Sequence, residues 1–143
     1  GLFPKVGVSK EQAATIGFSM LYEPNKLYDI PLDDPEFFTR DPSRQEFVAT
    51  DDLTLRQCSA GFYLASRRMD KVIAKLGGAP RAPIHLMLAG DDRIIDNEET
   101  LAFLQERPAP RDRMVRYDDD RHALEFDCFP AFSTDLVEFL GRA

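Results

Sequence analysis

The pattern of apolar and polar residues changes at about residue 50. Before it, aromatic side chains alternate with proline-containing turns such as Asp41-Pro42, and no apolar period is sustained. We therefore predict that residues 1–50 are irregular, with short helices at most. After residue 50 the pattern becomes regular, and it predicts helices and strands in alternation.

A helix is predicted over residues 53–76, because apolar residues recur there at steps of three and four and form one stripe. The stripe consists of Leu55, Cys58, Phe62, Ala65, Met69, Val72, Ile73 and Leu76. Candidate caps for its N-terminus are Asp51, Asp52 and Thr54. Gly77-Gly78 is typical of a helix C-terminus, where a glycine adopts the left-handed backbone conformation and ends the helix.

Two strands are predicted in the remaining chain. Residues 83–89 are almost continuously apolar and too short for a helix between Pro80 and Gly90, which is typical of a strand buried on both faces. A second strand is expected over residues 113–117. Because helices alternate with these strands, the pattern predicts an α/β fold with a parallel sheet.

Two further helices are predicted around the second strand. Asp96 and Glu99 have the spacing of a capping box, which predicts a helix over residues 97–106 before two prolines stop it. Phe132, Leu136, Phe139 and Leu140 predict a closing helix over residues 130–141.

Composition restricts the class of protein. The chain has 143 residues and a formal net charge of −7, so we expect one globular domain and no nucleic-acid partner. No apolar run approaches the roughly 18 residues of a membrane span, and no leader peptide is apparent, so we expect a soluble, unsecreted protein. Because the chain begins at Gly1, we interpret its start as a processing point, an engineered start or the start of a fragment.

The cysteines and histidines are too few for a disulfide framework or a zinc cluster. Cys58 and Cys128 are the two cysteines, and no Cys-x-x-Cys pair occurs. We expect a reducing, cytoplasmic compartment and no metal or cofactor.

One acid and one imidazole follow the two predicted strands. Asp92 comes directly after the first strand, and His122 follows the second strand across an acidic turn. Because the carboxyl ends of parallel strands share one edge of a sheet, these side chains are expected to face each other. A carboxylate beside a histidine fixes the tautomer of the imidazole and prepares its other nitrogen to accept a proton.

The residues around these two side chains resemble the α/β-hydrolase fold, in particular its monoacylglycerol lipase and lysophospholipase branch. The resemblance rests on Asp92-Arg93-Ile94-Ile95-Asp96 and on the segment from Tyr117 through His122 to Glu125, and is strongest over residues 47–143. It implies a serine-dependent hydrolase of acyl-ester lipids or other small esters. It also implies a cap- or lid-like segment at residues 1–50 and the C-terminal portion of the core at residues 51–143.

The nucleophile of such an enzyme is missing from these residues. The family places its serine on a Gly-x-Ser-x-Gly elbow before the Asp and the His, and no such elbow is present. Ser19 comes nearest, but Leu21 occupies the position of the second glycine, and Ser59 lies inside the predicted helix. We therefore expect a C-terminal portion of a hydrolase whose N-terminal half is a required partner, and self-association of the isolated chain through an unpaired sheet edge.

Several alternatives stay open beside the Asp92–His122 pair. Asp91 is a rival for the acid, whereas Asp96 is better explained as a helix cap, and His85 as a core side chain of the strand. Residues 118–120 are expected to form a solvated turn rather than a cation site. The aromatic residues of the cap, which include Phe37, Phe38, Tyr22 and Tyr28, line an acyl pocket or fill a small core. As a whole, the chain could also be a non-catalytic binding module derived from a hydrolase tail.

Overall fold

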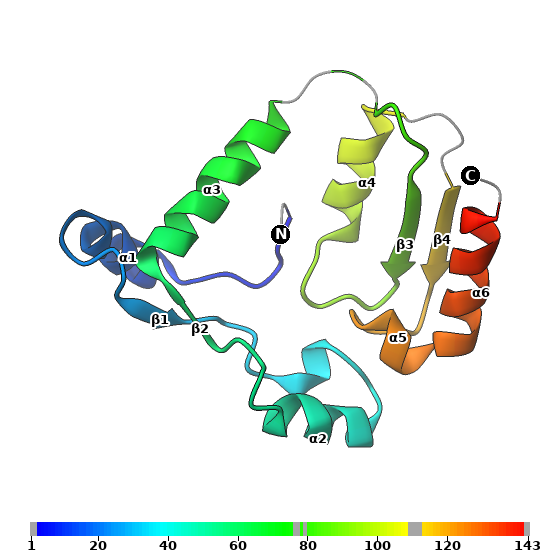
Figure 1. The fold of residues 1–143 in the computed structure, drawn as a ribbon, viewed down its shortest axis with the longest axis horizontal. Helices are drawn as coiled ribbons and strands as arrows, with labels where there is room; N and C mark the ends of the chain where they lie inside the picture. Colours follow the sequence, from blue (N-terminus) through cyan, green and yellow to red (C-terminus); the bar gives the residue numbers. More distant parts are fainter. Residues whose placement is uncertain (1–2, 76–77, 79, 109–112, 142–143) are drawn as a thin grey trace.

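The computed structural model describes residues 3–75, 78, 80–108 and 113–141. The first part of the chain contains α1 (Lys10–Tyr22), β1 (Leu27–Asp29), the 3-10 helix η1 (Pro35–Phe37), α2 (Pro42–Thr50), β2 (Gln57–Ser59) and α3 (Ala60–Ala74). The second part contains β3 (His85–Ala89), α4 (Asn97–Gln105), β4 (Arg113–Tyr117), α5 (Leu124–Asp127) and α6 (Phe129–Leu140). Figure 1 shows the two parts side by side, with α2 and α5 close together below them.

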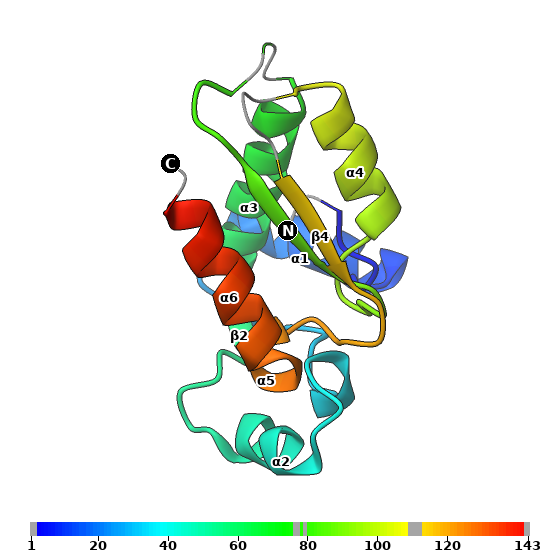
Figure 2. The ribbon, with the colours of Figure 1, turned by 90° about the vertical axis from the view of Figure 1, so that its right-hand side faces the viewer.

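The second part is a layered α/β unit. Strands β3 and β4 are parallel, and their register runs from His85 opposite Arg113 to Ala89 opposite Tyr117. Helices α4 and α6 lie on opposite sides of this strand pair (Figures 1 and 2). Both predicted strands are therefore present, and the predicted α/β fold is confirmed.

Alternate residues of β3 and β4 face the two helices, as the period of a strand requires. Leu86 and Met114 contribute with α4 residues to an apolar pocket of about 390 Å³, lined by Ile84, Leu86, Leu101, Leu104, Gln105, Pro108, Arg113 and Met114. On the other face, the imidazole of His85 packs on Phe139 of α6 at 4.8 Å between ring centroids. The Tyr117 hydroxyl donates to Asp135 Oδ2 of α6 at 2.7 Å.

The prediction of irregular structure over residues 1–50 is wrong for α1, which has 13 residues. The Ser9 hydroxyl caps this helix by accepting a hydrogen bond from the Gln12 N–H at 3.1 Å. Helix α1 packs on α3, yet it buries only Ile16 and Ser19. Because its large apolar side chains, such as Leu21, remain exposed, no apolar stripe marks the helix in the sequence.

The helix predicted over residues 53–76 begins later than expected, at Ala60. The side chain of Ser59 caps it by accepting from the Phe62 N–H at 3.1 Å, so the caps expected at residues 51–54 are wrong. The reason is tertiary, because residues 57–59 pair as β2 with β1 in an antiparallel arrangement. The helix ends at Ala74, Gly78 has a positive φ of 89°, and residues 76–77 of the predicted stop lie outside the described residues.

The remaining helices follow their sequence signals. Asp96 caps α4 through a hydrogen bond from the Glu99 N–H to its Oδ1 at 3.0 Å. The closing helix appears as α6, preceded by the single turn α5, which the sequence pattern does not indicate. No helix of the described ranges has both the length and the apolar composition needed to cross a membrane.

Candidate active site

The site lies where the loops after β3 and β4 meet. The Gly90 N–H donates to the Tyr117 carbonyl at 2.7 Å, and the Asp91 N–H donates to the Asp120 carbonyl at 3.1 Å. A β-carbon added at Gly90 would lie 2.6 Å from the carbonyl carbon of Asp118, closer than any side chain can approach. Glycine at position 90 thus allows the two loops to touch, which places the residues after each strand side by side.

Asp92 and His122 are brought together by this arrangement. His122 Nδ1 lies 2.9 Å from Asp92 Oδ2, a hydrogen-bonding distance. The other carboxylate oxygen, Oδ1, accepts the backbone N–H groups of Ile94 at 2.8 Å and Ile95 at 2.9 Å. The Asp92 side chain is 8% exposed, whereas that of His122 is 37% exposed, so the imidazole has an open side.

The environment shifts the pKa of both groups toward their charged forms. Burial is the largest influence on Asp92 and raises its pKa, but the hydrogen bonds from His122 and from two backbone N–H groups together outweigh burial and lower it. For His122, the hydrogen bond to Asp92 raises the pKa against the opposing effect of burial, with smaller contributions from the charges of Asp92 and Glu125. The pair is therefore arranged to hold an imidazolium against a carboxylate.

These shifts predict how stability depends on pH. The pKa of His122 in the folded protein lies above its usual value of 6.5. Its contribution to the unfolding free energy is therefore fully present below pH 6.5 and is lost as pH rises through the folded pKa. The pKa of folded Asp92 lies below its usual 3.8, so its contribution is present above that value and is lost as pH falls through the folded pKa. We expect the difference in unfolding free energy between wild type and His122→Gln to be largest in weakly acidic solution, as measured by urea denaturation.

His85→Gln is a matched control for that measurement. Burial, with a smaller effect of the Arg113 charge, lowers the pKa of His85. Protonation of His85 on acidification therefore destabilises the wild-type protein. The effect of His85→Gln on the unfolding free energy should thus have the opposite pH dependence to that of His122→Gln. A His122→Gln effect that stays constant from acidic to alkaline solution would contradict the pairing.

The rival residues of the sequence analysis have other partners. Asp91 Oδ2 lies 2.6 Å from Arg40 Nη2 and 3.3 Å from Arg121 Nε, so its carboxylate is engaged in ion pairs. Asp96 caps α4, and His85 lies in β3 against α6. In the described ranges no three His, Cys, Asp or Glu side chains are grouped so that they could hold a metal ion.

The two candidate serines are also engaged elsewhere. The Ser19 hydroxyl is 2.5 Å from the hydroxyl of Tyr28, within the first part of the chain, and Ser59 caps α3. In the part of the chain that the structure describes, His122 makes no hydrogen bond to a serine hydroxyl. The imidazole is bordered instead by Phe38, whose ring meets it edge-on at 6.3 Å between centroids and 75° between planes.

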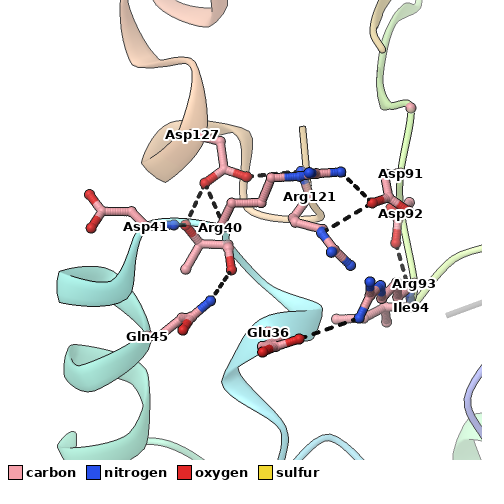
Figure 3. A network of polar contacts seen from close by, with 12 residues as sticks. Glu36, Arg40, Asp41, Gln45, Asp91, Asp92, Arg93, Ile94, Arg121 and Asp127 are labelled. Carbon is pink, nitrogen blue, oxygen red and sulfur yellow. Dashed lines mark hydrogen bonds and ion pairs between the residues drawn. The ribbon is translucent and has the colours of Figure 1, made fainter. Parts of the chain in front are cut away.

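A polar network joins the site to the segment before α2, and the sequence analysis missed it (Figure 3). It contains the ion pairs of Arg40 and Arg121 with Asp91, and a weaker pair of Arg93 Nη1 with Glu36 Oε2 at 3.6 Å. Asp127 connects the same regions through hydrogen bonds to residues 39, 40 and 121. Because most of these partners are more than 50 residues apart in sequence, no local pattern could indicate them.

Comparisons with known proteins identify a family and a fold for this chain. The family model of serine aminopeptidase, S33, matches residues 6–128. The solved structure of the Paleococcus ferrophilus monoacylglycerol lipase is 18% identical with a TM-score of 0.81, and the match covers 93% of this chain and 52% of that chain. A soluble variant of the monoglyceride lipase from Saccharomyces cerevisiae, in complex with a substrate analog, is 18% identical with a TM-score of 0.70, covering 91% of this chain and 47% of that chain.

At this level of identity the solved structures establish the fold, and the chain spans about half the length of each. A comparison with curated proteins gives no match. Because the family model covers most of the residues, from the first part of the chain through His122, the chain belongs to the serine aminopeptidase S33 family of α/β hydrolases.

Proposed function

We propose that the protein hydrolyses carboxylic esters, such as acylglycerols or lysophospholipids, through a serine acyl-enzyme in which Asp92 and His122 complete the triad. The observation that carries this proposal is the 2.9 Å contact between Nδ1 of His122 and Oδ2 of Asp92 at the ends of two parallel strands. The two similar structures are a monoacylglycerol lipase and a monoglyceride lipase, which supports lipid esters as the substrate class.

The pair suits both halves of the reaction. With its Nδ1–H donated to Asp92, neutral His122 accepts the serine proton at Nε2 while the serine oxygen bonds to the ester carbonyl carbon. The imidazolium then returns the proton to the leaving alcohol, and the acyl group stays on the serine. A water molecule next gives one proton to His122 Nε2 as its oxygen bonds to the acyl carbon. The imidazolium then donates that proton to the serine oxygen as the bond between this oxygen and the acyl carbon breaks, which releases the carboxylic acid and restores the free serine and neutral His122.

We infer that the nucleophilic serine and the oxyanion hole come from outside these 143 residues. Both candidate serines have other hydrogen-bond partners, and the chain spans about half the length of the similar lipases. The partner needed for activity is then the other half of the hydrolase. Since β3 and β4 pair only with each other among the described strands, an isolated chain is expected to self-associate through a free edge.

We assign residues 1–50 to a cap that shapes the acyl site and residues 51–143 to the C-terminal portion of the core. The position of Phe38 supports a cap, because its ring borders the open imidazole of His122. The Phe38 carbonyl also accepts a hydrogen bond from the Ala123 N–H at 2.8 Å, which holds this part of the cap beside the site.

The proposal is tested by comparing two proteins, the 143-residue chain and the product of the complete reading frame that encodes it. Each is assayed with a short-chain p-nitrophenyl ester and with a monoacylglycerol. We expect turnover only in the longer protein, and we expect His122→Ala to abolish it while His85→Gln keeps it, because His85 lies outside the site.

Three outcomes would overturn parts of this proposal. Strong turnover by the 143-residue chain that is lost on Ser19→Ala would show that the serine lies within it. Turnover by the longer protein that survives His122→Ala would contradict the role of the imidazole. A longer protein that is folded but hydrolyses neither ester would favour the alternative, a non-catalytic module that keeps the hydrolase fold.

A further inference from the structure

The carboxylate of Asp127, at the end of α5, accepts three hydrogen bonds, two from the distant cap residues 39–40 and one from Arg121, six residues before it. Its Oδ1 accepts the hydroxyl of Thr39 and, at 3.1 Å, the N–H of Arg40. Its Oδ2 accepts the N–H of Arg121 at 2.9 Å. In Figure 3 dashed lines join this carboxylate to the cap segment at Arg40 and to Arg121.

His122 is held on both sides by bonds that lead to the cap. On one side the N–H of Arg121 is bound by Asp127, and on the other the N–H of Ala123 is bound by the Phe38 carbonyl at 2.8 Å. The imidazole itself meets the Phe38 ring edge-on. The backbone around His122 is therefore fixed by residues 38–40, either directly or through the single carboxylate of Asp127.

The cap end of this connection is itself well fixed. Thr39 is fully buried, at 0% exposure, and its hydroxyl also accepts the Asp41 N–H at 3.1 Å. Gln45 of α2 donates its side-chain amide to the Thr39 carbonyl at 2.9 Å. These hydrogen bonds are half-buried, and breaking them without replacement leaves polar groups unpaired, so a shift of α2 would be transmitted through Thr39 to Asp127.

Helix stability alone does not explain an acid at position 127. A carboxylate just before a helix can stabilise it by accepting its first N–H groups, and Asp127 lies two residues before α6 begins at Phe129. Asp127 does not act in this way, because α6 has no side-chain cap and none of the hydrogen bonds of the Asp127 carboxylate comes from α5 or α6. Its three donors come instead from the cap and from the residue before His122.

We propose that Asp127 is a positioning residue for His122, which holds the imidazole against Asp92 and makes that position depend on segment 38–41 of the cap. The inference rests on the proposed function and adds a route by which an occupied cap would act on the base. A displacement of about 1 Å at a catalytic group can lower the rate by as much as about 100-fold. Small movements of the cap are therefore sufficient to control turnover.

The test uses two substitutions that break the connection in different ways. Asp127→Asn keeps the size of the side chain, but its NH₂ group must then face one of the three donors. Thr39→Val removes the cap hydroxyl without changing any charge. Two controls match them: Thr39→Ser keeps the hydroxyl, and Asp119→Asn removes a charge at an exposed residue with no side-chain hydrogen bond or ion pair to the described residues.

The first measurement is NMR of the His122 imidazole in the 143-residue chain, which has only one other histidine. We expect the pKa of His122 to fall toward its usual value, and the Nδ1–H signal to exchange faster with water, in Asp127→Asn and Thr39→Val. Both controls should match wild type. In the longer, active protein, the two variants should lower kcat about 10- to 100-fold and change KM less than about twofold.

Wild-type imidazole signals in folded Asp127→Asn and Thr39→Val would overturn the inference. If Asp127→Asn does not fold, the comparison of Thr39→Val with Thr39→Ser decides the outcome. The NMR measurement needs no turnover, so it separates this inference from the proposed function. An unreactive longer protein with altered His122 signals in both variants would contradict only the ester hydrolysis.

Discussion

Replacing Asp92 with Asn is expected to lower kcat for ester hydrolysis about 10⁴-fold in the protein that contains the serine. The reason is specific to this site, because two backbone N–H groups, from Ile94 and Ile95, point at Oδ1. They select the carbonyl oxygen of the asparagine, so its NH₂ group must face Nδ1 of His122. Two donors cannot face each other across that contact, so the imidazole would carry its proton on Nε2 instead of Nδ1. A protonated Nε2 can no longer accept the proton of the serine hydroxyl.

The matched control for Asp92→Asn is Asp96→Asn, in the same loop. Asp96 caps α4, and asparagine is as good an N-terminal cap as aspartate, so activity and stability should stay close to wild type. Steady-state kinetics gives kcat, and ¹⁵N NMR of the 143-residue chain reports the tautomer of His122. An Asp92→Asn enzyme within tenfold of wild type would show that the carboxylate does not orient the imidazole.

Replacing Gly90 with Ala is expected to destabilise the fold by about 3 kcal/mol or more. The added β-carbon would overlap the backbone of Asp118, which cannot rotate away as a flexible side chain would. Relief requires the loops after β3 and β4 to separate, and the Asp91 N–H would then lose the Asp120 carbonyl. The same separation would pull Asp92 away from His122, so the NMR signature of the pair should disappear together with the stability.

Gly17→Ala is the matched control for that experiment and should have the opposite sign. Gly17 lies inside α1, and a β-carbon there would meet no atom within 4 Å. Alanine is favoured over glycine in a helix, so we expect a gain of about 0.5–1 kcal/mol in unfolding free energy, measured by urea denaturation. A Gly90→Ala protein as stable as wild type would mean that the two loops can separate at little cost.

The contact between Asp92 and His122 could be predicted from the sequence because it depends on local patterns. Each residue follows a recognisable strand, and parallel strands bring their carboxyl ends to one edge. The start of α3 could not be predicted in this way, since Cys58 continues the apolar stripe but residues 57–59 pair with β1. Pairing with a distant strand outweighed the local helical preference there.

The contacts of Asp127 were beyond sequence reasoning for a related reason. Its hydrogen bond to the Arg40 N–H joins residues that are 87 positions apart, and the chain contains many other acidic residues from which Asp127 does not stand out. Nothing in the sequence around residue 127 separates it from the acids of residues 118–120, of which Asp118 and Asp119 are exposed. Only the folded arrangement, which buries Thr39 and brings α5 to the cap, distinguishes it.

The bonds that cross between cap and core have a consequence for how the molecule opens. The N–H groups of Arg40, Arg121 and Ala123 are each bound by an acceptor from another segment, and one acceptor serves two of them. A fluctuation that displaces the Asp127 carboxylate therefore releases the N–H groups of both Arg40 and Arg121. Because the acceptor of the Ala123 N–H, the Phe38 carbonyl, belongs to the same cap segment, we expect the three amides to exchange with solvent together and cap and core to unfold as one cooperative unit.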